Sequence, residues 1–91
     1  MSMLLQELRI LPATDTHPTL TYCLFCEQRR REEGEGWRDS FSLLLRSGEE
    51  VCLLSDITSE RAYAIELLCL FAGHTVTPCG AVEVMEELLS R

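Results

Sequence analysis

The sequence predicts an α+β fold in which an antiparallel sheet of three or four strands packs on two C-terminal amphipathic helices. Short segments rich in β-forming residues follow one another up to residue 54, and turn residues separate them. Two segments with helical periodicity occupy residues 59–91. A chain of 91 residues is long enough for one hydrophobic core and too short for two, so we expect residues 1–91 to form one domain.

The N-terminal third favours two strands. Met3–Leu11 alternates apolar and charged residues before a proline, which is typical of a strand with one wet face, and a short helix is the competing interpretation. Leu20–Glu27 is rich in β-forming residues on both faces, so we expect both faces of this strand to be at least partly covered. Between them, Ala13–Pro18 has the composition of a turn or loop, in which we expect His17 to be solvated rather than catalytic.

A charged hairpin and two further strands follow. Residues 28–36 contain three arginines, three glutamates and two glycines, which cannot bury enough apolar surface to become ordered, so we expect a mobile hairpin tip. After a turn at residues 47–49, Val51–Leu54 forms a last short strand, and strands two to four make a meander. In the strand between, alternation predicts five core-facing residues: Trp37, Asp39, Phe41, Leu43 and Leu45.

Two amphipathic helices complete the chain. Thr58 and Ser59 offer N-cap hydroxyls to the first helix, and Gly73 ends it. Thr77-Pro78 begins the second helix, and Arg91 suits the negative end of its dipole. The predicted inward residues are Ala64, Leu67, Leu68 and Phe71 in the first helix, and Val82, Met85, Leu88 and Leu89 in the second.

The composition restricts the location and the partners. Acidic residues outnumber basic ones 15 to 8, and a net charge of −7 repels a phosphate backbone, so nucleic acid is a disfavoured partner. No apolar run reaches the roughly 18 residues of a membrane span, and the N-terminus lacks the features of a signal peptide. We therefore expect a soluble, cytoplasmic protein with no membrane contact, and reduced thiols for its five cysteines.

The cysteines are the first candidates for chemistry. Cys23 and Cys26 have the spacing of half a zinc site, but residues three apart in a strand point to opposite faces. A distant set of Cys23, Cys26, His74 and Cys79 has enough ligands for a metal, and Cys79 near a helix N-terminus has the position of a thiol with a lowered pKa. We favour simple packing roles, and expect no catalytic residue, metal or other cofactor.

Two polar clusters are further candidates. Asp56 follows a strand beside several hydroxyl residues, as in some cation and phosphate sites, but helix capping explains it more simply. Arg29, Arg30 and Arg31 form the single basic cluster, close to Trp37, and the adjacent glutamates neutralise it. A solvated loop tip is the simpler interpretation, and contact of these four residues with a protein partner is the functional one.

Several segments resemble a family of short bacterial proteins of uncharacterised function. They are Ser55 to Arg61, Ile65 to Leu68, Val76-Thr77-Pro78 and Val82 to Leu89, and the similarity covers roughly Tyr22 to Leu89. The resemblance implies a small antiparallel sheet with two C-terminal helices. It transfers no catalytic residue, because the matching residues are those of helix capping and packing.

These observations favour a non-enzymatic protein–protein interaction or regulatory module. An uncovered sheet edge or the helical face offers a surface for a second copy, so a homodimer or an unidentified protein partner is expected. The alternative is a small metal- or thiol-dependent protein that uses Cys23, Cys26, His74 and Cys79. A nucleic-acid role through the arginine cluster is the least favoured because of the net charge.

Overall fold

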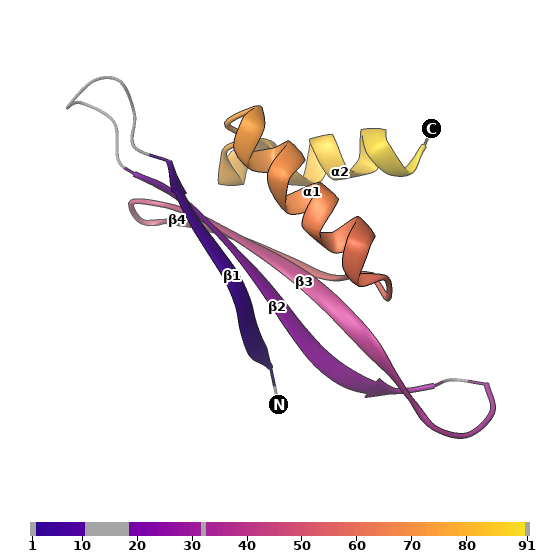
Figure 1. Cartoon of the computed structure of the whole chain (residues 1–91). Coiled ribbons are helices and arrows are strands. Elements are labelled where there is room, and N and C mark those ends of the chain that lie inside the picture. Colours follow the sequence, from indigo (N-terminus) through magenta and orange to yellow (C-terminus); the bar gives the residue numbers. More distant parts are fainter. Residues whose placement is uncertain (1, 11–18, 32, 91) are drawn as a thin grey trace.

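A four-stranded antiparallel sheet carries the two described α-helices on one of its faces (Figure 1). The computed structural model describes residues 2–10, 19–31 and 33–90. The predicted loop Ala13–Pro18, with His17, and the terminal Arg91 lie outside the described residues. The elements are strands β1 (Met3–Ile10), β2 (Leu20–Arg30), β3 (Trp37–Ser47) and β4 (Glu50–Thr58), helix α1 (Arg61–Gly73), the 3₁₀ turn η1 (Pro78–Gly80) and helix α2 (Ala81–Leu89). The predicted α+β class is confirmed, with the strands in the order β1-β2-β3-β4.

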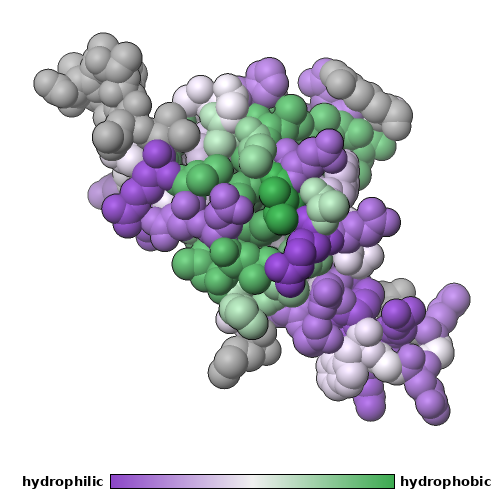
Figure 2. All heavy atoms as spheres, viewed as in Figure 1, coloured by the Kyte–Doolittle hydropathy of each residue, from purple (hydrophilic) through white to green (hydrophobic). Residues whose placement is uncertain are grey.

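The hydrophobic core lies between the helices and the covered face of the sheet. Strand alternation turns every second residue of β2 and β3 toward the helices, as predicted for β3 from Phe41 to Leu45. The predicted inward face of α1 is confirmed, because its buried residues are Ala64, Leu67, Leu68 and Phe71. Figure 2 shows apolar residues gathered where α1 meets the sheet beside β1, and hydrophilic residues at the hairpin end.

The β2–β3 hairpin extends beyond the helices. Strand β2 continues to Arg30, which pairs with Trp37, so the connection is residues 31–36 rather than the predicted 28–36. Trp37 was predicted to face the core, but 60% of its surface is exposed. Trp37 is exposed because α1 does not extend over it. The helix begins beside Phe41, where the Arg61 guanidinium lies 5.8 Å from the centre of the Phe41 ring. Mobility of the hairpin tip stays a prediction.

Helix α2 is rotated relative to the prediction. Met85 is buried and Leu88 half-buried, as expected, but Val82 and Leu89 are exposed, and Ala81 is buried instead. Pro78 does begin this part of the chain, yet the first turn is the 3₁₀ turn η1. A 3₁₀ turn has three residues rather than 3.6, so it shifts the phase of the following helix. Neither described helix is long and apolar enough to cross a membrane.

The ends of α1 also differ from the prediction. Strand β4 continues through Thr58, so neither Thr58 nor Ser59 is the N-cap of α1. Glu60 takes that position, and its backbone N–H donates to Thr58 Oγ1 at 3.1 Å. Gly73 is the last helical residue, as predicted, but the left-handed conformation occurs two residues later at Thr75, with φ of 53°.

A buried hydrogen bond joins the connection between the helices to the sheet. The Tyr22 hydroxyl, on a side chain with no exposed surface, donates to the backbone carbonyl of Val76 at 2.7 Å. Burial raises the pKa of Tyr22, so the hydroxyl keeps its proton over the physiological range. Because residues 54 apart are joined here, this bond fixes where η1 and α2 begin relative to β2.

We predict that Tyr22→Phe lowers the free energy of unfolding by about 1 to 2 kcal/mol, because it keeps the ring but leaves the Val76 carbonyl buried without its donor. Urea denaturation measures the change. Tyr63→Phe, on a partly exposed tyrosine of α1, is the control and should change stability by less than about 0.5 kcal/mol. Equal effects of the two substitutions would contradict a structural role for the Tyr22 hydroxyl.

Candidate functional site: the uncovered sheet face

The second face of the sheet has no described helix against it (Figure 1). Cross-strand pairs place apolar residues in its middle: Leu4 is opposite Phe25, and Leu44 is opposite both Cys23 and Leu53. We call this surface the open face and define its apolar centre as Leu4, Phe25, Leu44, Val51 and Leu53. Three of the five are exposed, with 57% of Leu53 accessible, and the other two are half-buried.

The open face is hollowed along its centre. Phe25, Leu44 and Leu53 line a depression of about 440 Å³, together with polar residues that include Glu27 and Arg29. A shallow apolar depression with polar margins is the form that protein-binding surfaces commonly take. Sequence reasoning missed this site, because it assumed that both faces of β2 were at least partly covered.

Arg38 and Asp56 close one end of the open face. Asp56 lies where β4 makes a bulge against β3 between the pairs Leu43–Leu54 and Phe41–Thr58, and its φ of 52° is left-handed. Both guanidinium Nη atoms of Arg38 donate to the Asp56 carboxylate, at 2.9 and 2.7 Å.

Two serines complete the network around Asp56. Ser40 Oγ donates to the carboxylate at 2.7 Å, and Ser42 Oγ accepts from the Asp56 backbone N–H at 3.1 Å. The hydrogen bonds from Arg38 and then Ser40 hold the pKa of Asp56 far below its usual range. Asp56 therefore neither caps α1 nor remains available as a proton donor, and its carboxylate stabilises the β4 bulge.

Two further ion pairs lie on the open face. Arg29 Nη2 lies 2.7 Å from Glu27 Oε1 and donates to Ser55 Oγ at 3.4 Å. At the other end of the strands, Arg9 Nε lies 2.9 Å from Glu7 Oε1. The four arginines that alternation places on this face, with Arg46 included, therefore nearly balance its three carboxylates.

The helical layer carries the opposite balance. Between residues 59 and 90 the chain has five glutamates, and Arg61 is the single arginine. The net charge of −7 is thus concentrated away from the open face, on the helices and at the ends of the sheet. The open face is a large apolar surface that lies outside this region of negative potential.

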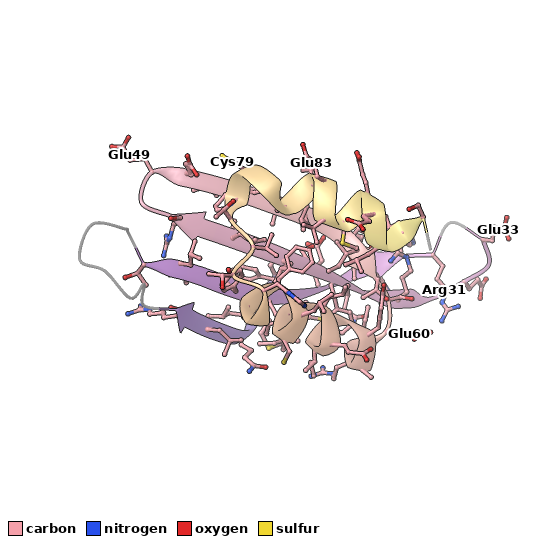
Figure 3. The ribbon with its side chains drawn as sticks, turned by 90° about the horizontal axis from the view of Figure 1, so that it is seen from above. Arg31, Glu33, Glu49, Glu60, Cys79 and Glu83 are labelled. Atoms are coloured by element: carbon pink, nitrogen blue, oxygen red, sulfur yellow. The ribbon has the colours of Figure 1, made fainter. Side chains whose placement is uncertain are left out.

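The predicted partner-binding residues do not form one cluster. Arg29 points to the open face, whereas Arg30 and Trp37 lie on the opposite side of the hairpin, with the Arg30 guanidinium 5.9 Å from the indole centre. Arg31 Nε donates to the Trp37 carbonyl at 3.5 Å. Figure 3 shows Arg31 and Glu33 at the same end of the molecule, so acidic and basic groups share the hairpin tip.

The predicted ligand set is dispersed. Cys23 is buried in the open face and Cys26 lies on the helical side, as expected from their spacing. His74 follows α1, and Cys79 is exposed in η1. Within residues 2–10, 19–31 and 33–90, no three His, Cys, Asp or Glu side chains are close enough to hold a metal ion.

Cys79 has the opposite electrostatics from those expected of a reactive thiol. Its Sγ donates to Glu50 Oε2 at 3.4 Å, and this hydrogen bond to a carboxylate raises the pKa of the thiol. The sequence prediction considered the helix N-terminus, which lowers a thiol pKa. It did not include Glu50, because a residue 29 positions earlier in the chain becomes a neighbour of Cys79 only in the folded structure.

Comparison of the chain with protein families, with curated proteins and with solved structures found no match. The resemblance to a family of short bacterial proteins therefore stays a prediction.

We predict that Asp56→Asn lowers the free energy of unfolding at pH 7 by about 1 to 3 kcal/mol, because the charged hydrogen bonds from Arg38 are weakened. Asparagine tolerates the left-handed backbone, so the substitution tests the charge rather than the conformation. A carboxyl with a depressed native pKa stabilises above its unfolded pKa of about 3.9 and loses this contribution as pH falls toward the native value.

Urea denaturation from pH 7 down to pH 2 therefore should show the difference between the native chain and Asp56→Asn shrinking below about pH 4. Glu33→Gln, which removes the same charge from the exposed hairpin tip, is the matched control and should have little effect on stability. A difference that stays constant over the whole range would show that Asp56 is not held ionised by this network.

We also predict that Glu50→Gln lowers the pKa of Cys79 and speeds its alkylation by iodoacetamide at pH 8, because the carboxylate that stabilises the protonated thiol is removed. Peptide mass spectrometry measures the rate at each cysteine. Glu49→Gln, one residue earlier, should leave the Cys79 rate unchanged. No acceleration in Glu50→Gln would show that the hydrogen bond does not persist in solution.

Proposed function

We propose that this chain is a non-enzymatic protein-interaction module that forms a two-fold homodimer through its open face. The observation that carries the proposal is the coincidence of an apolar centre with balanced charge on one face of a strongly acidic molecule. Two copies with a net charge of −7 repel each other in most orientations. Face-to-face packing of the open faces keeps both acidic helical layers on the outside.

The size of the open face supports a weak, reversible dimer. Four strands about 4.8 Å apart and about nine residues long form a face of roughly 19 by 30 Å, or about 570 Å². Two such faces bury on the order of 1,100 Å², which is close to the lower limit of about 1,200 Å² for stable interfaces. Two sheets packed about 10 Å apart, as in a β-sandwich, are the expected geometry.

The sheet edges are less suited to a second copy. Strand β1 has an irregular register between Leu4 and Gln6, and the bulge at Asp56 interrupts β4. Bulges of this kind protect an edge strand from pairing with another chain, because the ladder of backbone hydrogen bonds cannot continue. The sheet edge, which the sequence offered for a second copy, is therefore less suited to that role than the open face.

Other properties support a binding role in a reducing compartment. All five cysteines are free, which fits the cytoplasm. The thiol of Cys79, once a candidate nucleophile, has a raised pKa. The Asp56 carboxylate is held by Arg38 and Ser40 rather than directed to a cavity. The net charge still disfavours nucleic acid as a partner.

Sedimentation velocity over a range of concentrations tests the proposal. We expect a reversible change from 10.4 kDa to twice that mass, with a micromolar dissociation constant. Leu53→Glu should weaken the dimer at least about tenfold, because it buries a charge in the apolar centre of the interface. Val82→Glu is the matched control: Val82 is 49% exposed in the helical layer, so the same kind of change should leave the dimer intact.

Two outcomes would contradict the homodimer. One is a monomer at every concentration up to about 1 mM, since even a weak specific interface associates below that value. The other is a dimer that survives Leu53→Glu and is lost in Val82→Glu, which would move the interface to the helices. Circular dichroism of both variants confirms that the fold is retained.

A further inference from the structure

A second apolar surface lies in the helical layer, between α1 and α2. Figure 3 shows the two helices side by side above the sheet, running in opposite directions. A depression of about 430 Å³ opens between the C-terminal half of α1 and α2, and a smaller one of about 220 Å³ continues it toward Tyr63. Both are lined by Leu70 and Leu88, so they adjoin, and we call the two together the groove.

The floor and walls of this groove are apolar. Phe71 and Leu67 are buried at its base, and Leu70, Val84 and Leu88 form its sides. Leu70 lies in the C-terminal half of α1 and is partly exposed, because α2 does not close over it. The groove is therefore suited to contact the apolar side chains that another segment presents on one face of a helix.

The charged side chains among the described residues that line the groove are carboxylates. Glu66 of α1 lines the smaller depression at its Tyr63 end, and Glu87 of α2 lines the larger one. No lysine or arginine is among the described residues that line it, and His74 is its single imidazole. A segment that places apolar residues in the groove thus meets a carboxylate from each helix at its margins.

We infer that the α1–α2 groove binds a cationic amphipathic helix of a partner protein. Apolar side chains at positions i, i+3, i+4 and i+7 of the partner occupy the groove, and its lysine or arginine residues face Glu66 and Glu87. The acidic helical layer attracts such a segment from a distance, which accelerates association. An acidic or uncharged amphipathic segment has the same apolar contacts and lacks this attraction.

This site is independent of the proposed homodimer. The groove and the open face lie on opposite sides of the sheet, so a dimer formed through the open face leaves both grooves accessible. A dimer then presents two grooves and binds two segments of one partner with increased avidity. The groove itself requires only one copy of the chain.

A synthetic peptide provides the test, because the natural partner is not identified. The probe is a 14-residue peptide of leucines at helical spacing with lysines elsewhere, and its matched control has glutamate in place of lysine. Amide chemical shifts of the full-length ¹⁵N-labelled chain are followed during titration. We expect shift changes along α1, residues 74–80 and α2 with the lysine peptide, affinity that falls as salt rises, and at least about tenfold weaker binding of the glutamate peptide.

Two double substitutions distinguish the effect of the carboxylates that line the groove from the effect of other carboxylates in the helical layer. Glu66→Gln with Glu87→Gln removes both marginal carboxylates and should weaken binding of the lysine peptide about fivefold. Glu83→Gln with Glu86→Gln removes the same charge outside the groove, and Figure 3 shows Glu83 on the side of α2 away from α1, so this control should change binding by less than about twofold.

Three results would overturn the inference. They are equal loss of affinity in the two double variants, equal binding of both peptides, and shift changes on the open face instead of the helices. The titration is repeated with Leu53→Glu, which removes the proposed dimer. Unchanged groove shifts in that variant support the inference even where the homodimer itself is not found.

Discussion

The whole structure depends on one constraint: two helices of 13 and nine residues can cover only one face of a four-stranded sheet. A 13-residue helix is about 20 Å long, which is shorter than the strands of the β2–β3 hairpin. The core therefore forms on one side, with Tyr22 at its centre. Its hydroxyl holds the connection between the helices against the sheet, so the position of α2 depends on that single-sided core.

One-sided burial also explains how charge is distributed. On the uncovered side, Arg9, Arg29 and Arg38 are held in ion pairs with carboxylates, and the pair of Arg38 with Asp56 is the best connected. The helices carry five glutamates and a single arginine between residues 59 and 90. The same constraint thus produces an apolar, nearly neutral face and an acidic, grooved one, and it separates the two surfaces by the thickness of the sheet.

The sequence predicted what depends on periodicity alone. Phe41 to Leu45 and the α1 stripe from Ala64 to Phe71 follow from periods of 2 and 3.6, and the structure confirms both. The sequence did not predict features that depend on contacts between residues distant along the chain. The Asp56 bulge requires a left-handed residue and a register change, and the inward face of α2 depends on a 3₁₀ turn that no residue pattern distinguishes from a helical one. The groove depends on how far apart the two helices lie, and the open face depends on both helices packing on the same side of the sheet; periodicity encodes neither.

The central claim is that a second copy covers the open face. Isotope-filtered nuclear Overhauser spectroscopy on a mixture of labelled and unlabelled chains detects contacts between copies directly. We predict intermolecular contacts between the methyl groups of Leu44 and Leu53 in one copy and the Phe25 ring in the other, because a two-fold axis through the open face brings these residues together. Intermolecular contacts confined to α1 and α2, or none at concentrations where the chain is dimeric, would contradict it.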